Sequence, residues 1–381
     1  MDHPTLRWRP RRGTHPPCPG GPPVRVLAAM SGGVDSSVAA AMMHREGHEV
    51  TGVTLKLWQG PDGEAPAHGC CTVSDSEDAR RVAAGLDIPY YVFDYTDDFA
   101  SAVVDPFVEA YRNGRTPNPC VECNRSIKFS ILLEEADRLD CDLLVTGHYA
   151  RVSREGGRWR LRRGVDPSKD QSYVLHMLGQ RELARTRFPV GEMTKPETRR
   201  VAADLGLRNA HKRDSYEICF IANDYRRFIA RRAPEAVRPG RIVDASRNRL
   251  GEHPGVVNFT VGQRRGLGVA VGEPRYVVEL DPHTSTVVIG SARDLLTEAV
   301  EVEGVTWVDG APPPESPTEC LVQVRVHGQP VRALLAPLES GSDRWQVSFV
   351  EPQSSPAPGQ MAVFYRGDRV LGGGTIDRLL K

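Results

Sequence analysis

The sequence contains no apolar run of the roughly 18 residues that a membrane-spanning helix requires, so we expect no contact with a membrane. Its N-terminus also lacks the apolar segment of a secretory signal peptide. Eight cysteines in 381 residues do not resemble the disulfide framework of a small secreted domain. A reducing, cytoplasmic location is therefore expected, where clustered cysteines indicate catalysis or metal binding.

No sign of charge is in excess either, because 49 Lys and Arg residues balance 49 Asp and Glu residues. An anionic partner would therefore be held by a local basic patch and not by the overall charge. Residues 1–23 differ from the rest, since they are rich in Arg and Pro and nearly free of apolar side chains. This composition predicts a disordered tail, either a dispensable extension or a basic arm for nucleic acid.

From residue 24 onward, short strand-like runs alternate with amphipathic helical segments. The predicted strands cover residues 24–30, 48–58, 89–95 and 142–147, and the predicted helices cover 36–46, 75–86 (with Asp75 as N-cap), 99–112 and 126–139. This alternation predicts an α/β domain with a parallel sheet over residues 24–225, whose ligands gather beyond the carboxyl ends of the strands.

The pattern changes in the second half of the chain. Residues 226–290 begin with an arginine-rich stretch broken by Pro and Gly, which indicates a small central domain. Residues 291–381 lose the helical period and alternate like short strands separated by turns. We predict a C-terminal antiparallel β-barrel there, with a sandwich as the alternative.

The first predicted strand leads into SGGVDSS, Ser31 to Ser37, and then into the first predicted helix. Glycines let the backbone approach an anion closely, and N–H groups at a helix start bind phosphate. A Walker loop needs a lysine that SGGVDSS lacks, and Asp35 stands in this loop instead. A carboxylate beside phosphates suits a Mg²⁺ ion that neutralises both, so Asp35 is a candidate magnesium ligand. The alternative is an ordinary Gly-Gly turn with a serine cap.

The same loop resembles the pyrophosphatase-type loop of ATP-pyrophosphatases, which cleave ATP between its α and β phosphates and adenylate an oxygen of the substrate. Enzymes that make argininosuccinate, NAD⁺, GMP and modified tRNA share it, so the loop alone does not name the substrate. The resemblance implies ATP and Mg²⁺ as cofactors. It assigns to the nucleotide site Ala29, Met30, Ser31, Gly32, Gly33, Val34, Asp35, Ser36, Ser37, Leu55 and Gly147.

Two cysteines, Cys120 and Cys123, lie in the segment GRTPNPCVECNRSIKF. Pro117 and Pro119 are expected to exclude helix, which would place both cysteines on a loop that enters the helix predicted from residue 126. A helix start and the basic residues that follow would lower the pKa of a thiol there. The segment therefore predicts reactive thiolates or metal ligands.

Further cysteines leave three interpretations open. Cys219 lies in RDSYEICFIAND, and Cys70 and Cys71 are adjacent. The cysteines could form a structural zinc site, hold an iron–sulfur cluster through three ligands, or pass sulfur as a persulfide. The remaining cysteines are interpreted as a tail, a core and a strand residue, namely Cys18, Cys141 and Cys320.

From residue 24 onward the chain resembles the tRNA-specific 2-thiouridylases. The resemblance is carried, in order and approximate spacing, by SGGVDSS, GRTPNPCVECNRSIKF, TGHYARV, KDQSYVL, EICFIAND, NFTVGQRRGLG, PGQMAVFY and LGGG. It implies an adenine-nucleotide α-hydrolase-like sheet domain, and ATP-dependent transfer of sulfur to C2 of the wobble uridine of tRNA. The sulfur donor would be a cysteine desulfurase or a relay protein.

The resemblance also implies roles for the three cysteines. Cys219 would receive the persulfide sulfur, and Cys123 would be the second essential cysteine. Cys120 stands where many members carry an aspartate proposed as an acid/base, so that role is in doubt here. Three cysteines instead suit a [4Fe–4S] cluster. A second departure is Ser215-Tyr216-Glu217, where many members have Thr-Gly.

Contacts to the anticodon stem-loop of tRNA are implied for His148, Lys169, Asp170, Gln171, Arg325 and Gln360. His148 could instead be a core or capping residue, and Asp170 could cap a helix. Ten arginines between residues 226 and 265 fit contacts to RNA phosphates, or form a solvated face. Two rival functions remain: a different adenylating enzyme that needs no cysteine, and a zinc-stapled RNA-binding module without catalysis.

Overall fold

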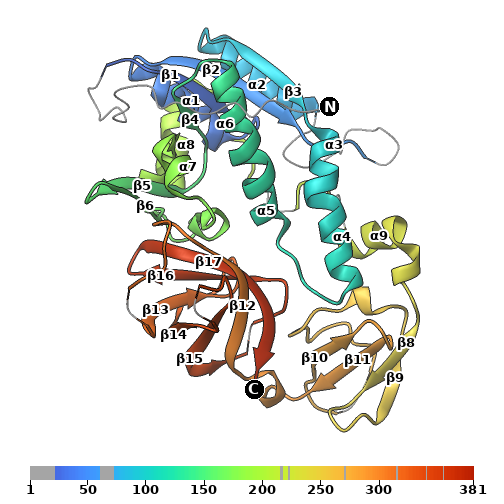
Figure 1. The fold of residues 1–381 in the computed structure, drawn as a ribbon. Helices are drawn as coiled ribbons and strands as arrows, with labels where there is room; N and C mark the ends of the chain where they lie inside the picture. Colours follow the sequence, from blue (N-terminus) through green and yellow to red (C-terminus); the bar gives the residue numbers. More distant parts are fainter. Residues whose placement is uncertain are drawn as a thin grey trace, which may run out of the picture.

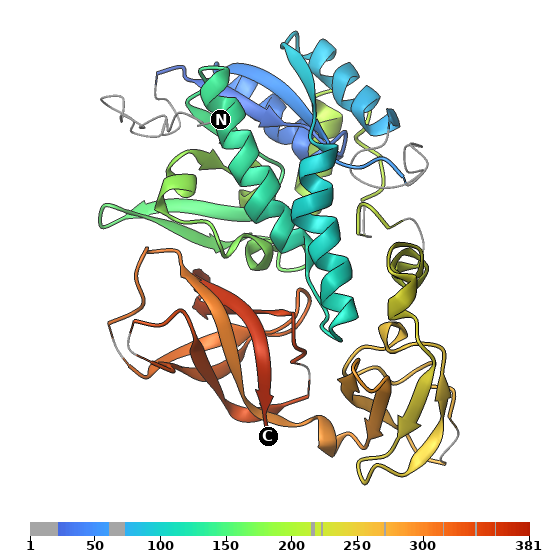
Figure 2. The same ribbon diagram turned by 45° about the vertical axis from the view of Figure 1, so that its right-hand side comes forward.

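The computed structural model describes residues 22–60, 73–214, 218–221, 224–269, 272–314, 316–339, 341–354 and 356–381. The predicted tail up to residue 21, Cys18, the Cys70-Cys71 pair and Ser215-Tyr216-Glu217 lie outside these residues. Figure 1 shows an α/β domain above two smaller β domains, and Figure 2 separates the central domain from the C-terminal barrel. The predicted fold class is confirmed.

A five-stranded parallel sheet forms the α/β domain, in the order β3-β2-β1-β4-β7. The central strand is hydrophobic on both faces, since Val26 and Ala28 pack into one core and Leu27 into the other. Burial on both faces is expected for a parallel sheet that helices cover. The strands are β1 Arg25–Ala29, β2 Glu49–Lys56, β3 Tyr90–Asp94, β4 Leu143–Val145 and β7 Thr186–Arg187.

Helices cover both faces of this sheet. On one face lie α1 (Val34–Arg45), α2 (Val73–Gly85) and α8 (Lys195–Asp204). On the other lie two long helical stretches that each contain a π-helical segment: α3 Thr96–Phe99, η1 Ala100–Val104 and α4 Asp105–Arg112, then α5 Pro119–Glu122, η2 Cys123–Lys128 and α6 Phe129–Arg138. The predicted N-cap at Asp75 is wrong, because α2 already begins at Val73 and Asp75 lies in its first turn.

The central domain begins with α9 (Tyr225–Arg232) and contains a small mixed sheet in the order β10-β11-β8-β9. Its core is separate from that of its neighbours and includes Ile242, Val277, Val287 and Ile289. The strands are β8 Gly240–Val243, β9 Arg249–His253, β10 Tyr276–Asp281 and β11 Thr286–Gly290.

Six antiparallel strands close into the C-terminal barrel through a pairing of its first and last strands, β12 and β17. The strands are β12 Thr297–Trp307, β13 Thr318–Gln323, β14 Val331–Pro337, β15 Trp345–Gln353, β16 Met361–Arg366 and β17 Arg369–Leu380. A hairpin of the α/β domain, β5 (Ala150–Glu155) and β6 (Arg158–Arg163), extends this sheet from β17. The sequence did not predict this hairpin, which joins the first domain to the third.

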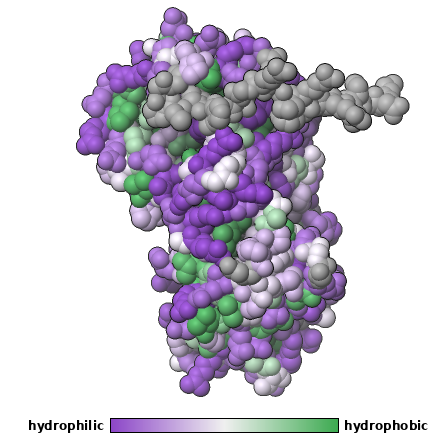
Figure 3. All heavy atoms as spheres, turned by 60° about the vertical axis from the view of Figure 1, so that its left-hand side comes forward, coloured by the Kyte–Doolittle hydropathy of each residue, from purple (hydrophilic) through white to green (hydrophobic). Residues whose placement is uncertain are grey.

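The face of the molecule in Figure 3 is covered mostly by hydrophilic residues, with hydrophobic residues in small groups. Within the part of the chain that the structure describes, none of the helices combines the length and the apolar character that spanning a membrane requires.

Candidate active site

The segment Ser31–Ser37 joins the carboxyl end of β1 to the start of α1, as the sequence predicted. Gly32 has φ +72°, and a Cβ there would lie 2.1 Å from the carbonyl oxygen of Asp75. Ser36 and Ser37 donate their hydroxyls to the carbonyl oxygen of Gly33, at 3.2 and 2.9 Å. The loop is thus a tight turn whose end presents the uncapped N–H groups of a twelve-residue helix to an anion.

The other predicted nucleotide residues lie at neighbouring strand ends. Ala29 ends β1, Leu55 is buried near the end of β2, and Gly147 follows β4. A Cβ on Gly147 would lie 2.5 Å from the backbone nitrogen of Ser36. The chain after β4 therefore passes directly against the phosphate loop, and only a glycine fits there.

A lysine that the sequence did not single out reaches this loop from the start of α8. Lys195 Nζ lies 2.7 and 2.8 Å from the two carboxylate oxygens of Asp35, and 2.8 Å from Asp214 Oδ1. The hydroxyl of Tyr149 also donates to Asp35, at 2.8 Å. The positive charge that SGGVDSS lacks is therefore supplied by a residue 160 positions later in the chain.

Asp214 is the second carboxylate of this network. It accepts bonds from Lys169 at 2.7 Å and from Arg199 at 2.8 Å, besides its contact with Lys195. Burial alone would raise the pKa of Asp214, but these cationic donors outweigh it and lower the pKa. Asp214 is therefore ionised at neutral pH and holds three basic side chains together.

A second lysine holds the opposite side of the loop. Lys212 Nζ donates to the carbonyl oxygen of Gly32 at 3.2 Å, and to the carboxylates of Asp75 and Asp78 at 2.6 Å each. Burial would lower the pKa of Lys212, but its bonds to the two carboxylates raise it. Asn209 donates to the same Gly32 oxygen at 3.1 Å. An open surface cavity of about 400 Å³ lies beside these residues, lined by Asp78, Arg81, Val82, Arg208, Asn209 and Lys212.

No sequence signal connects these lysines to the loop. The capping box formed by Thr194 and Glu197 indicates where α8 starts, but it does not indicate what Lys195, the first residue of that helix, contacts.

The predicted loop conformation of Cys120 and Cys123 is wrong, because helix α5 already begins at Pro119. Proline is favourable in the first turn of a helix, where no backbone N–H is needed. Asn118 caps this helix by accepting from the backbone nitrogen of Cys120 at 3.2 Å. Cys120 is therefore exposed in the first helical turn, and Cys123 is buried at the start of the following π-helical turn.

Cys219 is half-buried in a short described stretch, 218–221, that packs against the same hydrophobic core as Cys123. Its neighbour Phe220 is 4% exposed and anchors the stretch. The Phe220 ring lies 5.3 to 6.0 Å from four other aromatic rings, those of Trp58, Phe99, Phe107 and Phe228. Cys219 is thus held by an aromatic cluster next to it.

The residues described do not gather three or more His, Cys, Asp or Glu side chains in an arrangement that could hold a metal ion. Among these residues Cys120, Cys123 and Cys219 are not gathered into a three-ligand site, and the iron–sulfur cluster stays a prediction. A single carboxylate such as Asp35 is sufficient for the usual mode of magnesium binding, in which one carboxylate and the substrate phosphates share the ion. The other two cysteines with known placement, Cys141 and Cys320, are a buried core and a buried strand residue as predicted, and burial raises the pKa of both.

The C-terminal barrel holds the loop in front of Cys120. Thr116 donates its backbone N–H to the carbonyl oxygen of Pro358 at 2.8 Å, and Gln360 donates to the carbonyl oxygen of Thr116 at 3.0 Å. A Cβ on Gly359, which has φ +90°, would lie 2.9 Å from the Thr116 nitrogen. The barrel therefore fixes the approach to the cysteine helix.

Replacing Gly359 with alanine is expected to shift this loop and raise the alkylation rate of the buried Cys123 by about threefold or more, because local opening of the segment exposes a buried thiol. The rate can be measured by mass spectrometry after timed iodoacetamide treatment. Gly367→Ala is the matched control, since Gly367 also has positive φ (+63°) but open space around it. Equal alkylation rates in the two variants would contradict a role for the contact between Gly359 and Thr116.

The side chains predicted to bind RNA after β4 are mostly engaged within the protein. His148 is buried between the rings of Phe129 and Phe188, and burial, with a smaller effect of Lys128, lowers its pKa well below the usual value. Asp170 accepts from Arg163 at 2.8 Å, and Gln171 accepts from the Tyr149 nitrogen at 2.9 Å. Their contacts with RNA stay predictions, and their side chains already stabilise this part of the fold.

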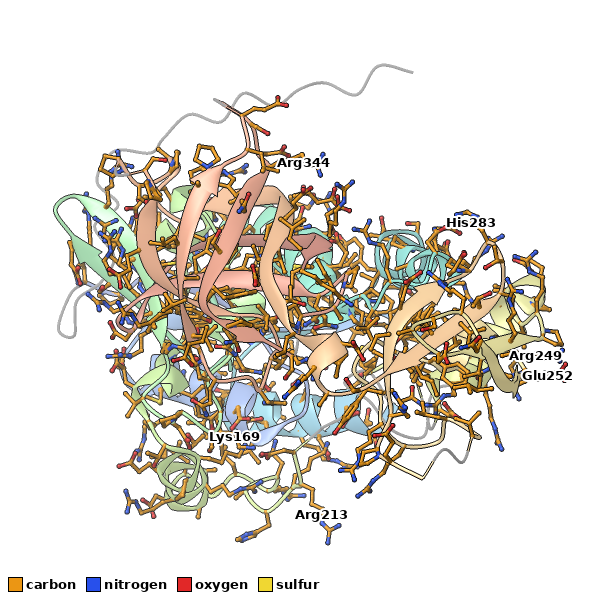
Figure 4. All side chains as sticks on the ribbon, turned by 90° about the horizontal axis from the view of Figure 1, so that it is seen from below. Lys169, Arg213, Arg249, Glu252, His283 and Arg344 are labelled. Carbon is orange, nitrogen blue, oxygen red and sulfur yellow. The ribbon has the colours of Figure 1, made fainter. Side chains whose placement is uncertain are left out.

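Basic side chains are spread over all three domains. Figure 4 shows Lys169 on the α/β domain, and Arg249 with Glu252 at the far end of the central domain. Arg325 reaches from the barrel to the central domain, where a Cβ on Gly262 would lie 3.1 Å from its guanidinium. Of the ten central arginines, six contact protein groups, while Arg227, Arg231, Arg264 and Arg265 are exposed and have no counter-charge among the described residues.

Three family models match the chain in sequence order. They are described as a tRNA methyl transferase HUP domain over residues 24–223, a tRNA methyl transferase PRC-barrel domain over 226–291, and an aminomethyltransferase beta-barrel domain over 297–376.

Relatives match over nearly their whole length. A tRNA-specific 2-thiouridylase MnmA from Chloroflexus aurantiacus is 51% identical and covers 93% of this chain and 98% of its own. Proteins of the same name from Roseiflexus sp. and Geobacter metallireducens are both 47% identical over 93% of this chain, and the matches cover 99% and 96% of their own chains.

Among solved structures, an NMN synthetase from Francisella tularensis matches with a TM-score of 0.31 at 13% identity, over 50% of this chain and 66% of its own. A match at this level establishes no common architecture.

Proposed function

Since this chain belongs to the tRNA-specific 2-thiouridylase family, we propose that it is the enzyme that converts the wobble uridine (position 34) of tRNA to 2-thiouridine at the expense of ATP. The observation that carries the proposal is a combination of two features in one protein: a phosphate loop contacted by lysines, and a cysteine, Cys219, anchored by a hydrophobic core. A methyl transferase, the name that two of the family models bear, would need no loop for the phosphates of ATP.

The first half of the reaction activates the base. The uridine C2 oxygen attacks the α phosphorus of ATP, the bond to the β phosphate breaks, and pyrophosphate leaves with the electron pair. The uracil ring loses its N3 proton to solvent. Ser31–Ser37 and the start of α1 hold the phosphates, and Mg²⁺ on Asp35 would supply charge neutralisation when bound. AMP then becomes the leaving group on C2.

The second half uses the cysteines. Cys219 carries a persulfide supplied by a cysteine desulfurase or a relay protein. Its terminal sulfur attacks C2, and AMP leaves. Cys123 then attacks the Sγ of Cys219, which releases 2-thiouridine and forms a Cys123–Cys219 disulfide that an external dithiol must reduce. This order requires the two cysteines to approach each other, and both already border one hydrophobic core.

The substrate is proposed to be the anticodon stem-loop, because a base in a single-stranded loop leaves its stack at a cost of only a few kcal/mol. The exposed arginines of the central domain, with Lys169, Arg325 and Gln360, would contact its backbone. We propose a cytoplasmic location, where tRNA and a persulfide donor meet.

Nucleoside analysis tests the function directly. Cells that lack the gene are expected to lose wobble 2-thiouridine in the tRNAs that carry it, and the intact gene should restore it. Full persistence of 2-thiouridine in the deletion strain would refute the proposal. ATP-to-AMP conversion by a Cys219→Ala variant on a substrate other than tRNA would favour a different adenylating enzyme, and stoichiometric zinc without AMP formation would favour a binding module.

A further inference from the structure

The phosphate loop lacks a lysine in sequence, but Lys195 reaches it from the start of α8. Its side chain is 10% exposed and its ammonium contacts both oxygens of Asp35 in the loop. An ammonium group has three donors and no acceptor, so each partner it can take is an anion or a polar oxygen. We propose that Lys195 is a catalytic residue that binds the departing pyrophosphate of ATP, an inference that rests on the proposed function.

The position of Lys195 is fixed before any substrate arrives. Its backbone nitrogen donates to Asp166 at 2.9 Å, and the capping box of Thr194 and Glu197 sets the start of its helix. The Lys195 ammonium lies 5.8 Å from the centre of the Tyr149 ring. A donor held in this way needs little reorganisation when charge develops on the leaving group, which is the condition for effective electrostatic catalysis.

Lys195 can exchange its contact with Asp35 for a contact with a phosphate group, because of where Asp35 lies. Asp35 lies in the first turn of α1, beside the N–H groups that bind phosphate. A polyphosphate at that helix start therefore competes with Asp35 for the same ammonium. When the bond between the α phosphorus and the bridging oxygen breaks, the new negative charge lies on pyrophosphate, and Lys195 stabilises it there. Asp35 becomes free for a cation as soon as the bound polyphosphate takes over the ammonium, before this bond breaks.

Asp214 keeps the ammonium in place during this exchange. It is 2.8 Å from Lys195 Nζ and is neutralised on its other sides by Lys169 and Arg199. Lys212, on the opposite side of the loop, is committed to two carboxylates and a carbonyl oxygen. Lys195 is thus the lysine placed to meet the leaving group, whereas Lys212 holds the loop itself.

The test measures pyrophosphate release from ATP in a single turnover with tRNA and without a sulfur donor, so that only the first half-reaction is seen. Lys195→Met is expected to lower this rate about 10²- to 10³-fold, the usual effect of losing one preorganised donor to a transition state. Lys195→Arg should recover part of the rate. Binding of α,β-methylene-ATP, measured by equilibrium dialysis, should weaken by about tenfold or less, because the donor acts mainly on the departing charge.

Arg200→Met is the matched control, because Arg200 lies on the same helix but is exposed and pairs with Glu197, at 4.0 Å, instead of with Asp35 or Asp214. Its rate should stay within about threefold of the wild-type rate. If Lys195→Met does not fold, the double variant Lys195→Met with Asp214→Asn removes the charge of one of the two carboxylates that lose their contact with Lys195, and is expected to show the same loss.

Two results would overturn the inference. The first is release within about threefold of wild type by Lys195→Met or the double variant, and the second is an equal loss in Arg200→Met, which would attribute the loss to damage to helix α8. Absence of pyrophosphate release from the wild-type protein with tRNA and ATP would instead refute the proposed function. The failure of the inference and the failure of the function are therefore distinguishable.

Discussion

Replacement of Cys219 by alanine is expected to abolish 2-thiouridine formation, by on the order of 10³-fold or more, while tRNA-dependent pyrophosphate release continues. The persulfide has no other carrier in the proposed route, whereas the phosphate loop and its lysines lie on other segments. The two half-reactions should therefore separate cleanly. Thiolated nucleosides are measured by mass spectrometry and pyrophosphate by a coupled assay on the same samples.

Cys320→Ala is the control for this experiment. Unlike the half-buried Cys219, Cys320 is fully buried in the barrel, where burial raises its pKa to about 12 and keeps it unreactive. Thiolation should persist in this variant after correction for any loss of folded protein. Normal thiolation by Cys219→Ala would show that sulfur travels by another route.

Replacement of Gly32 by alanine is expected to disable the nucleotide half of the reaction. The new Cβ would lie 2.1 Å from the carbonyl oxygen of Asp75, and the residue would keep φ +72°. Positive φ costs about 1 kcal/mol for alanine, and the overlap adds roughly 1–3 kcal/mol as the start of α2 moves. We expect the free energy of unfolding to fall by about 2–4 kcal/mol, and pyrophosphate release to fall about 100-fold as the loop is misplaced.

Gly33→Ala provides an adjacent comparison within the same motif. Gly33 has a negative φ of −81°, and the nearest atom to its added Cβ is Ser31 Oγ at 3.5 Å, an ordinary contact. This variant should fold normally, as judged by thermal unfolding, and keep most of its rate. Similar losses in both variants would mean that the loop tolerates no side chain for a reason other than the contact with Asp75.

The fold followed from the sequence where local pattern and packing agree. The strand of residues 24–30 is apolar on both of its faces, as expected for a strand of a parallel sheet that helices cover on both sides. The prediction at residues 117–123 was wrong for a local reason, since Pro119 starts a helix as readily as it blocks one. The hairpin of residues 150–163 was missed because its arginines are paired across domains, for example Arg151 with Asp368 at 2.7 Å.

The sequence by itself located two candidate centres, because each is marked by residues close together in the chain: the turn from Ser31 to Ser37, and the pair Cys120 and Cys123. Cys219 lies far from that pair in the chain, and only the family resemblance connected it to them. Tertiary structure alone decided what acts on those centres. Lys195 meets Asp35 across 160 residues, and Gln360 meets the loop before Cys120 across 244. Ionic and hydrogen-bond partners at such separations leave no periodicity or spacing in the sequence, because they are set by how strands and helices pack and not by their order.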